Sequence, residues 1–188
     1  MKHYFRDISR AGLMGMVGLM SALSMNATAA PRVVEPFDNA RWAALKADIK
    51  RPTAVVFTTT DCAHCPAVIK ALASDARVTR AKGGLVAVVM DVAPGEADAA
   101  LLKNAHYKPV DQLMAFSGQA PALRHAVNPT WRGVTPYIAL LRPGEPPLWV
   151  VGPPTRTDID AWMAPAAPTS PASMPALAPA STPSRKLP

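Results

Sequence analysis

Both cysteines of the chain lie in one short stretch, "TTTDCAHCP", as Cys62 and Cys65 with two residues between them. A disulfide that closes so short a loop removes little conformational entropy from the unfolded chain, so it would be a weak structural crosslink. Two thiols at this spacing can instead pass between the dithiol and the disulfide state by thiol–disulfide exchange. Redox exchange and a purely structural disulfide are therefore the first two interpretations.

The segments around the cysteines predict a strand followed by a helix. Residues 52–60, "PTAVVFTTT", are rich in β-branched and aromatic side chains, which is typical of a strand. Downstream, side chains recur at helical spacing at Cys65, Val68, Ile69 and Leu72. We expect a helix that begins around Cys62, with Cys62 at the exposed tip and Cys65 on the face that packs against a sheet. Cα atoms three residues apart at a helix start are close enough for a disulfide.

The start of a helix favours the thiolate form of a cysteine. Its free N–H groups and partial positive charge stabilise an anion, and such cysteines have pKa values of roughly 3.5–7.5. His64 can add a positive charge or a hydrogen bond at the sulfur of Cys62, which stabilises the reduced form and makes the disulfide a stronger oxidant. Asp61 places a negative charge beside the same sulfur and acts the other way. The sequence leaves this balance open.

The remaining elements predict one mixed sheet with helices on both faces. A helix over residues 38–50 carries Trp42, Leu45 and Ile49 on one stripe, and residues 85–92, "LVAVVMDV", read as a covered strand. Residues 94–127 look mainly helical, and 128–133 form a loop. Two strands, "TPYIALL" and "PLWVV", are joined by the tight turn "RPGEPP". A short helix over residues 155–163, capped by Thr157 or Asp158, ends the domain.

Composition divides the chain into three parts. Residues 1–29 combine basic residues, a short apolar run and a small-residue exit, which predicts a secretory signal peptide cleaved after Ala29. An uncleaved membrane anchor is the alternative, but the run is shorter than the roughly 20 apolar residues of a spanning helix. Residues 30–163 form the folded domain. Residues 164–188 alternate Pro with Ala and Ser, which predicts a disordered tail.

The charge pattern argues against nucleic-acid binding. The chain has a formal net charge of +7, but its Lys and Arg residues are spread along the sequence without a dense run. A surface that follows phosphates normally needs a clustered basic patch. We therefore expect no nucleic-acid partner. We also expect a periplasmic protein with no stable membrane insertion after signal cleavage, in a compartment where paired cysteines can stay oxidised.

At this point the sequence resembles the thioredoxin-like fold family over roughly residues 36–163. The resemblance is carried by a strand ending in "VVFTTT", by "DCAHC" opening a helix, and by "GVTPYIALL" before a hairpin. It implies an α/β thioredoxin-like fold, with a central mixed sheet flanked by helices and a helical insert before the cis-proline strand. It also implies that Cys62 attacks, that Cys65 resolves the mixed disulfide, and that Pro136 is cis and packs on the disulfide. Thr135 and Pro136 would bind the substrate backbone. Histidine at the position of His64 resembles the oxidising periplasmic members.

Two departures from the family pattern stand out. Many members have a buried carboxylic acid six residues before the first cysteine, where it accepts the proton of the second cysteine; this chain has Val56 there. The proton must then leave by another route, such as water or His64. The stretch before Pro136 is also longer than in a minimal thioredoxin. Its residues Tyr107, Trp131 and Arg132 either shape partner choice or are ordinary core and surface.

The function expected from these observations is thiol–disulfide exchange in an exported protein. Its partners would be protein thiols or disulfides and a membrane redox partner that recycles the cysteine pair, with no cofactor. The direction of electron flow stays open.

The alternative is a copper(I)-binding metallochaperone, because copper(I) accepts two thiolates readily. Its ligands would be Cys62 and Cys65 with a histidine or methionine, and the candidates for that position are His64, His106, His125 and Met114. A structural zinc site would need a second ligand pair, which the sequence does not provide. We interpret His106 and His125 as surface residues on helices.

Overall fold

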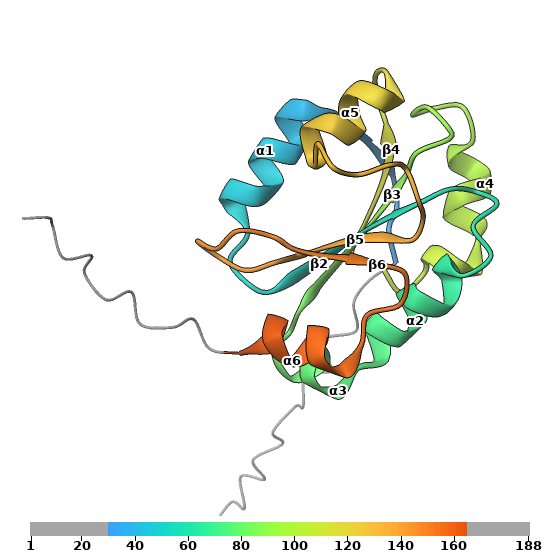
Figure 1. The fold of residues 1–188 in the computed structure, drawn as a ribbon. Helices are drawn as coiled ribbons and strands as arrows, with labels where there is room; N and C mark the ends of the chain where they lie inside the picture. Colours follow the sequence, from blue (N-terminus) through green and yellow to red (C-terminus); the bar gives the residue numbers. More distant parts are fainter. Residues whose placement is uncertain (1–29, 165–188) are drawn as a thin grey trace, which may run out of the picture.

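The computed structural model describes residues 30–164 (Figure 1). The predicted signal peptide, residues 1–29, lies outside the described residues, and so does the predicted tail apart from Ala164. The described part is one six-stranded sheet in the order β1-β4-β3-β2-β5-β6. Strands β1, β4, β3 and β2 are parallel to one another, whereas β5 pairs antiparallel with β2 and β6 pairs antiparallel with β5. The predicted α/β class with a central mixed sheet flanked by helices is therefore confirmed.

The strands are short; the four central strands are buried, and the edge strands β1 and β6 are partly exposed. Their bounds are β1 Val34–Phe37, β2 Thr53–Thr58, β3 Gly84–Val89, β4 Gln112–Phe116, β5 Tyr137–Leu141 and β6 Leu148–Val151. The helices are α1 Asn39–Asp48, α2 Cys65–Ser74, α3 Ala76–Arg80, α4 Asp98–Lys103, the 3-10 turn η1 Ala105–Tyr107, α5 Ala120–Val127 and α6 Arg156–Met163. Strands β2 and β3 are buried on both faces, which explains their continuous apolar runs.

Alternate residues of β2 point to opposite faces of the sheet and into separate cores. Val55 and Phe57 join α1 and α5 in one core, which is rich in aromatic side chains. Ala54 and Val56 join α2, α4, η1 and α6 in the other. The last residue of the strand, Thr58, therefore points to the α2 and η1 face. This alternation decides which side chains surround the cysteines.

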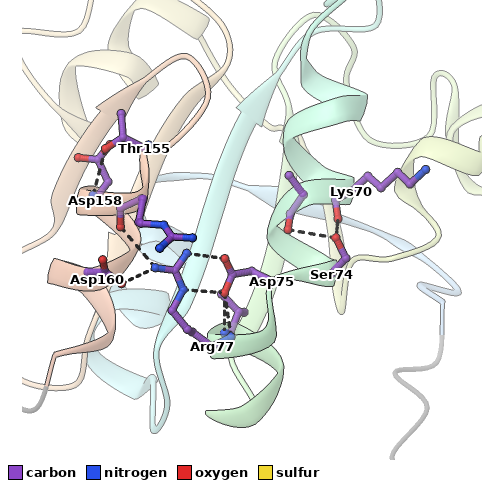
Figure 2. A network of polar contacts seen from close by, with 10 residues as sticks. Lys70, Ser74, Asp75, Arg77, Thr155, Asp158 and Asp160 are labelled. Carbon is purple, nitrogen blue, oxygen red and sulfur yellow. Dashed lines mark hydrogen bonds and ion pairs between the residues drawn. The ribbon is translucent and has the colours of Figure 1, made fainter.

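An ion-pair network joins α3 to α6 on the α2 side of the sheet (Figure 2). Asp75 caps α3 by accepting from the backbone N–H groups of Arg77 and Val78. The guanidinium of Arg77 bonds both carboxylate oxygens of Asp75, at 3.0 and 2.7 Å, and also pairs with Asp160 of α6. Because Asp75 directly follows α2, this network holds the end of the cysteine helix against the last helix of the domain.

Two strands differ from the sequence prediction. The segment around Leu113 and Met114 is the strand β4, so the expectation of a mainly helical stretch over 94–127 was wrong there, although α4, η1 and α5 are helical. Strand β1 was not predicted at all. Strands β1 and β4 pair with each other, with Val34 opposite Leu113. Because this pairing joins segments far apart in the chain, the local sequence pattern does not reveal either strand. Pro36 is tolerated in β1 because this strand lies at the sheet edge.

The elements predicted at the carboxyl-terminal end of the domain, two strands and a helix, are confirmed with one change in the helix cap. Strands β5 and β6 form the expected antiparallel hairpin, and Gly144 in its turn has φ 74°, a conformation that favours glycine. Helix α6 begins at Arg156 and is capped by Thr155, not by Thr157 or Asp158. Asp158 instead completes a capping box by bonding back to Thr155.

The arrangement around β2 is the one that the thioredoxin-like resemblance implies. A parallel β2–α2–β3 unit is followed by an antiparallel hairpin on the other side of β2 and by a final helix. The segment between β3 and β5 departs from a simple helical insert, because its strand β4 enters the sheet between β3 and β1. The insert is thus built into the sheet, and its η1 turn packs on the cysteine helix.

Candidate active site at the Cys62–Cys65 pair

The two cysteines form a disulfide at the carboxyl end of β2. Their Cα atoms lie 5.5 Å apart, within the range that a disulfide spans without backbone movement. Cys62 is half-buried in the turn, whereas Cys65 is only 2 % exposed and packs with the core beneath α2. The predicted inequality of the two thiols is therefore present in the structure.

Helix α2 begins later than the sequence prediction. Its first residue is Cys65 and its N-cap is His64, so Cys62 lies in the turn before the helix and not in its first turn. Pro66 is accommodated at the helix start, where backbone N–H groups have no intrahelical partner. Because the sulfur of Cys62 is bonded to that of Cys65, it still lies at the amino end of the helix. The partial positive charge there favours a thiolate once the bond is reduced.

Backbone and side-chain hydrogen bonds fix the turn that carries Cys62. The N–H of Cys62 donates to the carbonyl of Thr59 at 3.2 Å. The next residue, Thr60, donates from its backbone N–H and from its hydroxyl to the carboxylate of Asp91, which directly follows Met90 at the end of β3. The N–H of Met90 in turn donates to the carbonyl of Thr58. These bonds attach the turn to the neighbouring strand.

The side chains of Asp61 and His64 are both exposed beside the pair. The His64 side chain makes no capping hydrogen bond to α2. Both residues lie within two positions of Cys62 in the chain.

The Thr135–Pro136 peptide bond is cis. Tyr137 pairs with Phe57, so Thr135 and Pro136 follow the same register to the end of the sheet where the cysteine turn begins. Pro136 is buried and its carbonyl accepts from the N–H of Gly152, while Thr135 is half-buried. The preceding Val134 is 56 % exposed. The structure thus brings these predicted site residues to the cysteine edge.

The loop before Thr135 is held by Trp131. The indole N–H of Trp131 donates to the carbonyl of Val134 at 3.0 Å, and its ring stacks on Tyr137 with centroids 4.4 Å apart. Trp131 and Tyr107 are both buried, whereas Arg132 is exposed. Trp131 is therefore a core residue that also holds the loop before Thr135. Tyr107 is a core residue that also lines the pocket described next.

A pocket of about 240 Å³ lies behind the disulfide, on the α2 and η1 face. It is lined by Cys62, Cys65 and the preceding threonines, and by Asn104, His106 and Tyr107 from the η1 region. Sequence reasoning interpreted His106 as a surface residue on a helix. It is exposed, but it lies in a 3-10 turn and lines this pocket. No local signal marks it, because it is some forty residues from the cysteines and is placed only by the packing of η1 on α2.

Burial raises the pKa of the Tyr107 phenol, and the negative charge of Asp91 acts in the same direction. A hydrogen bond with Thr58 opposes this shift only in part. Tyr107 is therefore protonated at neutral pH and presents a neutral hydroxyl to the pocket. The position six residues before Cys62 is Val56, which is fully buried in the same core, so no carboxylate lies there.

The candidate copper ligands do not all gather at the cysteines. Met114 is fully buried in the core on the opposite face of the sheet, and His125 belongs to α5 on that same face. His106 is the candidate that shares a pocket with Cys62 and Cys65. Within residues 30–164, no group of three or more His, Cys, Asp or Glu side chains is arranged to hold a metal ion.

Comparisons with known proteins give one match. No protein-family model matches the chain, and no curated protein sequence matches it. Among solved structures, the chain is similar to a secreted Mycobacterium tuberculosis disulfide oxidoreductase described as homologous to E. coli DsbE. The similarity covers 60 % of this chain and 80 % of that chain, at 15 % sequence identity and a TM-score of 0.41.

Proposed function

We propose that the protein is a thiol–disulfide oxidoreductase that exchanges disulfides with protein substrates through Cys62 and Cys65. The observation that carries this proposal is the disulfide itself, at the start of α2, with one partly exposed and one buried sulfur. Attack on a substrate needs an accessible sulfur, and closure of the ring needs a second thiol held next to it. A structural crosslink needs neither.

The reaction proceeds in two exchanges. In the reducing direction, the Cys62 thiolate attacks a substrate disulfide, forms a mixed disulfide and releases one substrate thiolate, which takes up a proton. Cys65 loses its proton and attacks the Cys62 sulfur, so the mixed disulfide breaks and the second substrate thiol leaves. The reverse sequence oxidises a substrate dithiol. No electrons leave the two sulfur pairs, so no cofactor takes part.

His64 and the Thr135–Pro136 segment have supporting roles in this proposal. The exposed imidazole of His64 sets how strongly the disulfide oxidises its substrate, through its effect on the Cys62 thiolate. Thr135 and Pro136 bind the backbone of the partner, which fits their position at the cysteine edge beside the exposed Val134. An extended substrate segment there would bring its cysteine to Cys62.

We further propose that the protein works in the periplasm after removal of residues 1–29 and that a membrane redox partner recycles the pair. The proposal rests on the sequence pattern of the first 29 residues. In the described region, no helix has the length and apolar character of a membrane span. Mass spectrometry of the protein from a periplasmic extract should give a chain that starts at Ala30. A full-length chain in the membrane fraction would contradict cleavage.

Trapping of substrates tests the exchange and the two roles together. Cys65→Ser should accumulate mixed disulfides with partner proteins, visible as species that disappear on reduction in a non-reducing gel. Cys62→Ser should accumulate none, because its remaining thiol is buried. The Cys62→Ser, Cys65→Ser double variant is the control for incidental disulfides. Equal trapping by the two single variants would reject the assigned roles, and no trapping by either would reject the function.

A further inference from the structure

Cys65 faces a chemical problem in the exchange, because it must lose a proton before it can attack. Its side chain is 2 % exposed and lies on the buried face of α2 with Val68 and Ile69. A buried thiol ionises less readily than one in water, since the charged form loses its hydration. Val56, fully buried in the same core, provides no carboxylate to accept the proton. Some other group must take it.

The pocket behind the disulfide offers a path for that proton. Cys65 is part of its lining, and most of the other lining groups are polar: the hydroxyls of Thr58, Thr59, Thr60 and Tyr107, the carboxylate of Asp61, the amide of Asn104 and the imidazole of His106. Its volume of about 240 Å³ is several times the roughly 30 Å³ that one water occupies in the liquid. A chain of waters between Cys65 and the pocket mouth therefore has both the room and the partners it needs.

His106 lies in a position to end such a chain. Its side chain lines the pocket and is also exposed to solvent, so a proton that it accepts can leave the protein. Its backbone is held by a hydrogen bond from its own N–H to the side-chain oxygen of Asn104, at 3.0 Å. Imidazole is the side-chain group that ordinarily takes up and releases protons near neutral pH.

We propose that His106, acting through water in this pocket, accepts the proton of Cys65 when Cys65 attacks the mixed disulfide. This inference rests on the proposed exchange function. The S–H bond of Cys65 breaks, its sulfur forms the bond to Cys62, the bond between Cys62 and the substrate sulfur breaks, and the substrate leaves as a thiolate. The proton passes to His106 and then to solvent. In the opposite direction, His106 returns a proton to Cys65 when the ring opens.

The other titratable groups around the pocket do not fill this role as well. Tyr107 stays protonated at neutral pH, so it can relay a hydrogen bond but cannot take up the proton. Asp61 also lines the pocket, on the exposed turn beside Cys62, but a carboxylate is ordinarily a much weaker base than an imidazole. The charged groups next to η1 and on the facing helix α2 are all exposed; they are Lys103, Lys108, His64 and Lys70.

Rapid mixing of the reduced protein with Ellman's reagent separates the two exchange steps. The first phase is the attack of Cys62, and its rate rises with the reagent concentration. The second phase is the attack of Cys65 on the mixed disulfide, and its rate does not depend on the reagent. Cys65→Ser identifies the second phase by losing it. The release of the coloured thiolate reports both phases in one trace, at each pH from 5 to 9.

We expect His106→Gln to slow the second phase at pH 7 by about 10- to 100-fold, at the lower end of what general acid–base catalysis contributes. The rise of this phase with pH near neutrality should disappear, while the first phase keeps its wild-type rate. His125→Gln, an exposed histidine on the opposite face, is the matched control and should change neither phase. Added imidazole should restore part of the second phase in His106→Ala.

The outcomes distinguish this inference from the function on which it rests. If the wild-type protein shows no first phase, the exchange function fails. If both phases are present and His106→Gln resolves the mixed disulfide at the wild-type rate and pH dependence, the role of His106 is overturned while the function stands. A slow second phase in Tyr107→Phe together with a normal one in His106→Gln would also overturn it.

Discussion

The carboxylate of Asp91 accepts two hydrogen bonds from Thr60, one from the backbone N–H at 3.0 Å and one from the hydroxyl at 2.5 Å. Thr60 lies two residues before Cys62, and Asp91 lies two residues past the last residue of β3. The pair therefore joins the turn that carries Cys62 to β3, the strand next to β2. A turn held in this way keeps Cys62 near Cys65 when the disulfide is reduced.

Removal of this carboxylate should loosen the turn. We expect Asp91→Ala to lower the unfolding free energy of the oxidised protein by about 1 kcal/mol. This is less than the loss of a buried hydrogen bond to a charged group would cost, because Thr60 and Asp91 are both exposed. Hydrogen exchange at the Thr60 amide should become faster. The control is Asp98→Ala, which removes a similar bond to the Gly95 amide away from the cysteines. An unchanged Thr60 amide in Asp91→Ala would contradict the prediction.

The two thiols should differ in reactivity once reduced. We expect iodoacetamide at mildly acidic pH to modify Cys62 at least about tenfold faster than Cys65, because Cys62 is partly exposed at the start of α2 and Cys65 is buried. Peptide mapping by mass spectrometry after short exposure measures the ratio. Full unfolding in denaturant should bring the two rates together, which serves as the control. Equal rates in the folded protein would remove the basis for separate roles.

The imidazole of His64 should make the disulfide more oxidising. We expect His64→Gln to make the reduction potential more negative by about 30 mV, which corresponds to a tenfold change in the equilibrium with glutathione. The physical reason is the loss of a group that stabilises the Cys62 thiolate. The equilibrium is read by trapping thiols across glutathione buffers, with His125→Gln as the variant expected to match the wild type. An unshifted equilibrium in His64→Gln would leave His64 without a redox role.

The network of Figure 2 should make part of the stability depend on acid. Hydrogen bonding from Arg77 lowers the pKa of Asp75 from its ordinary value of 3.8 to about 2, against the effect of its partial burial. The folded state thus favours the ionised form, so its contribution is complete above about pH 4 and is lost as the pH falls through 2. We expect Asp75→Ala to cost about 1 kcal/mol at pH 7, as loss of an N-cap does.

Urea unfolding at pH 7 and at pH 2.5 tests this dependence. The difference in unfolding free energy between the wild type and Asp75→Ala should shrink at the lower pH, because Asp75 then takes up a proton in the unfolded chain, which weakens the preference for the folded state. Asp48→Ala removes an exposed carboxylate at the end of α1 and should show no such narrowing. A difference that stays constant between the two pH values would show that the charge of Asp75 does not contribute.

Local patterns were sufficient for the elements nearest the cysteines. Strand β2, helix α2 and the β5–β6 hairpin each carry their signal within a few consecutive residues: a β-branched run, a helical stripe behind Cys65, and Pro and Gly between two strands. Strand β4 carries no such signal, since Gln112, Leu113 and Met114 favour helices as readily. It is a strand because β1 and β3 provide hydrogen-bond partners on both sides.

The sequence by itself determined the chemistry of this protein: a close cysteine pair, a helix behind it, and unequal exposure of the two sulfurs, because each follows from residue type and spacing along one segment. Only the tertiary structure decided what surrounds the pair. Asp91 and His106 come from segments that are distant in the chain. Strand pairing brings Asp91 to Thr60 of the cysteine turn, and the packing of η1 on α2 brings His106 into the pocket that Cys62 and Cys65 line. Such contacts depend on the whole sheet, and no stretch of sequence specifies them alone.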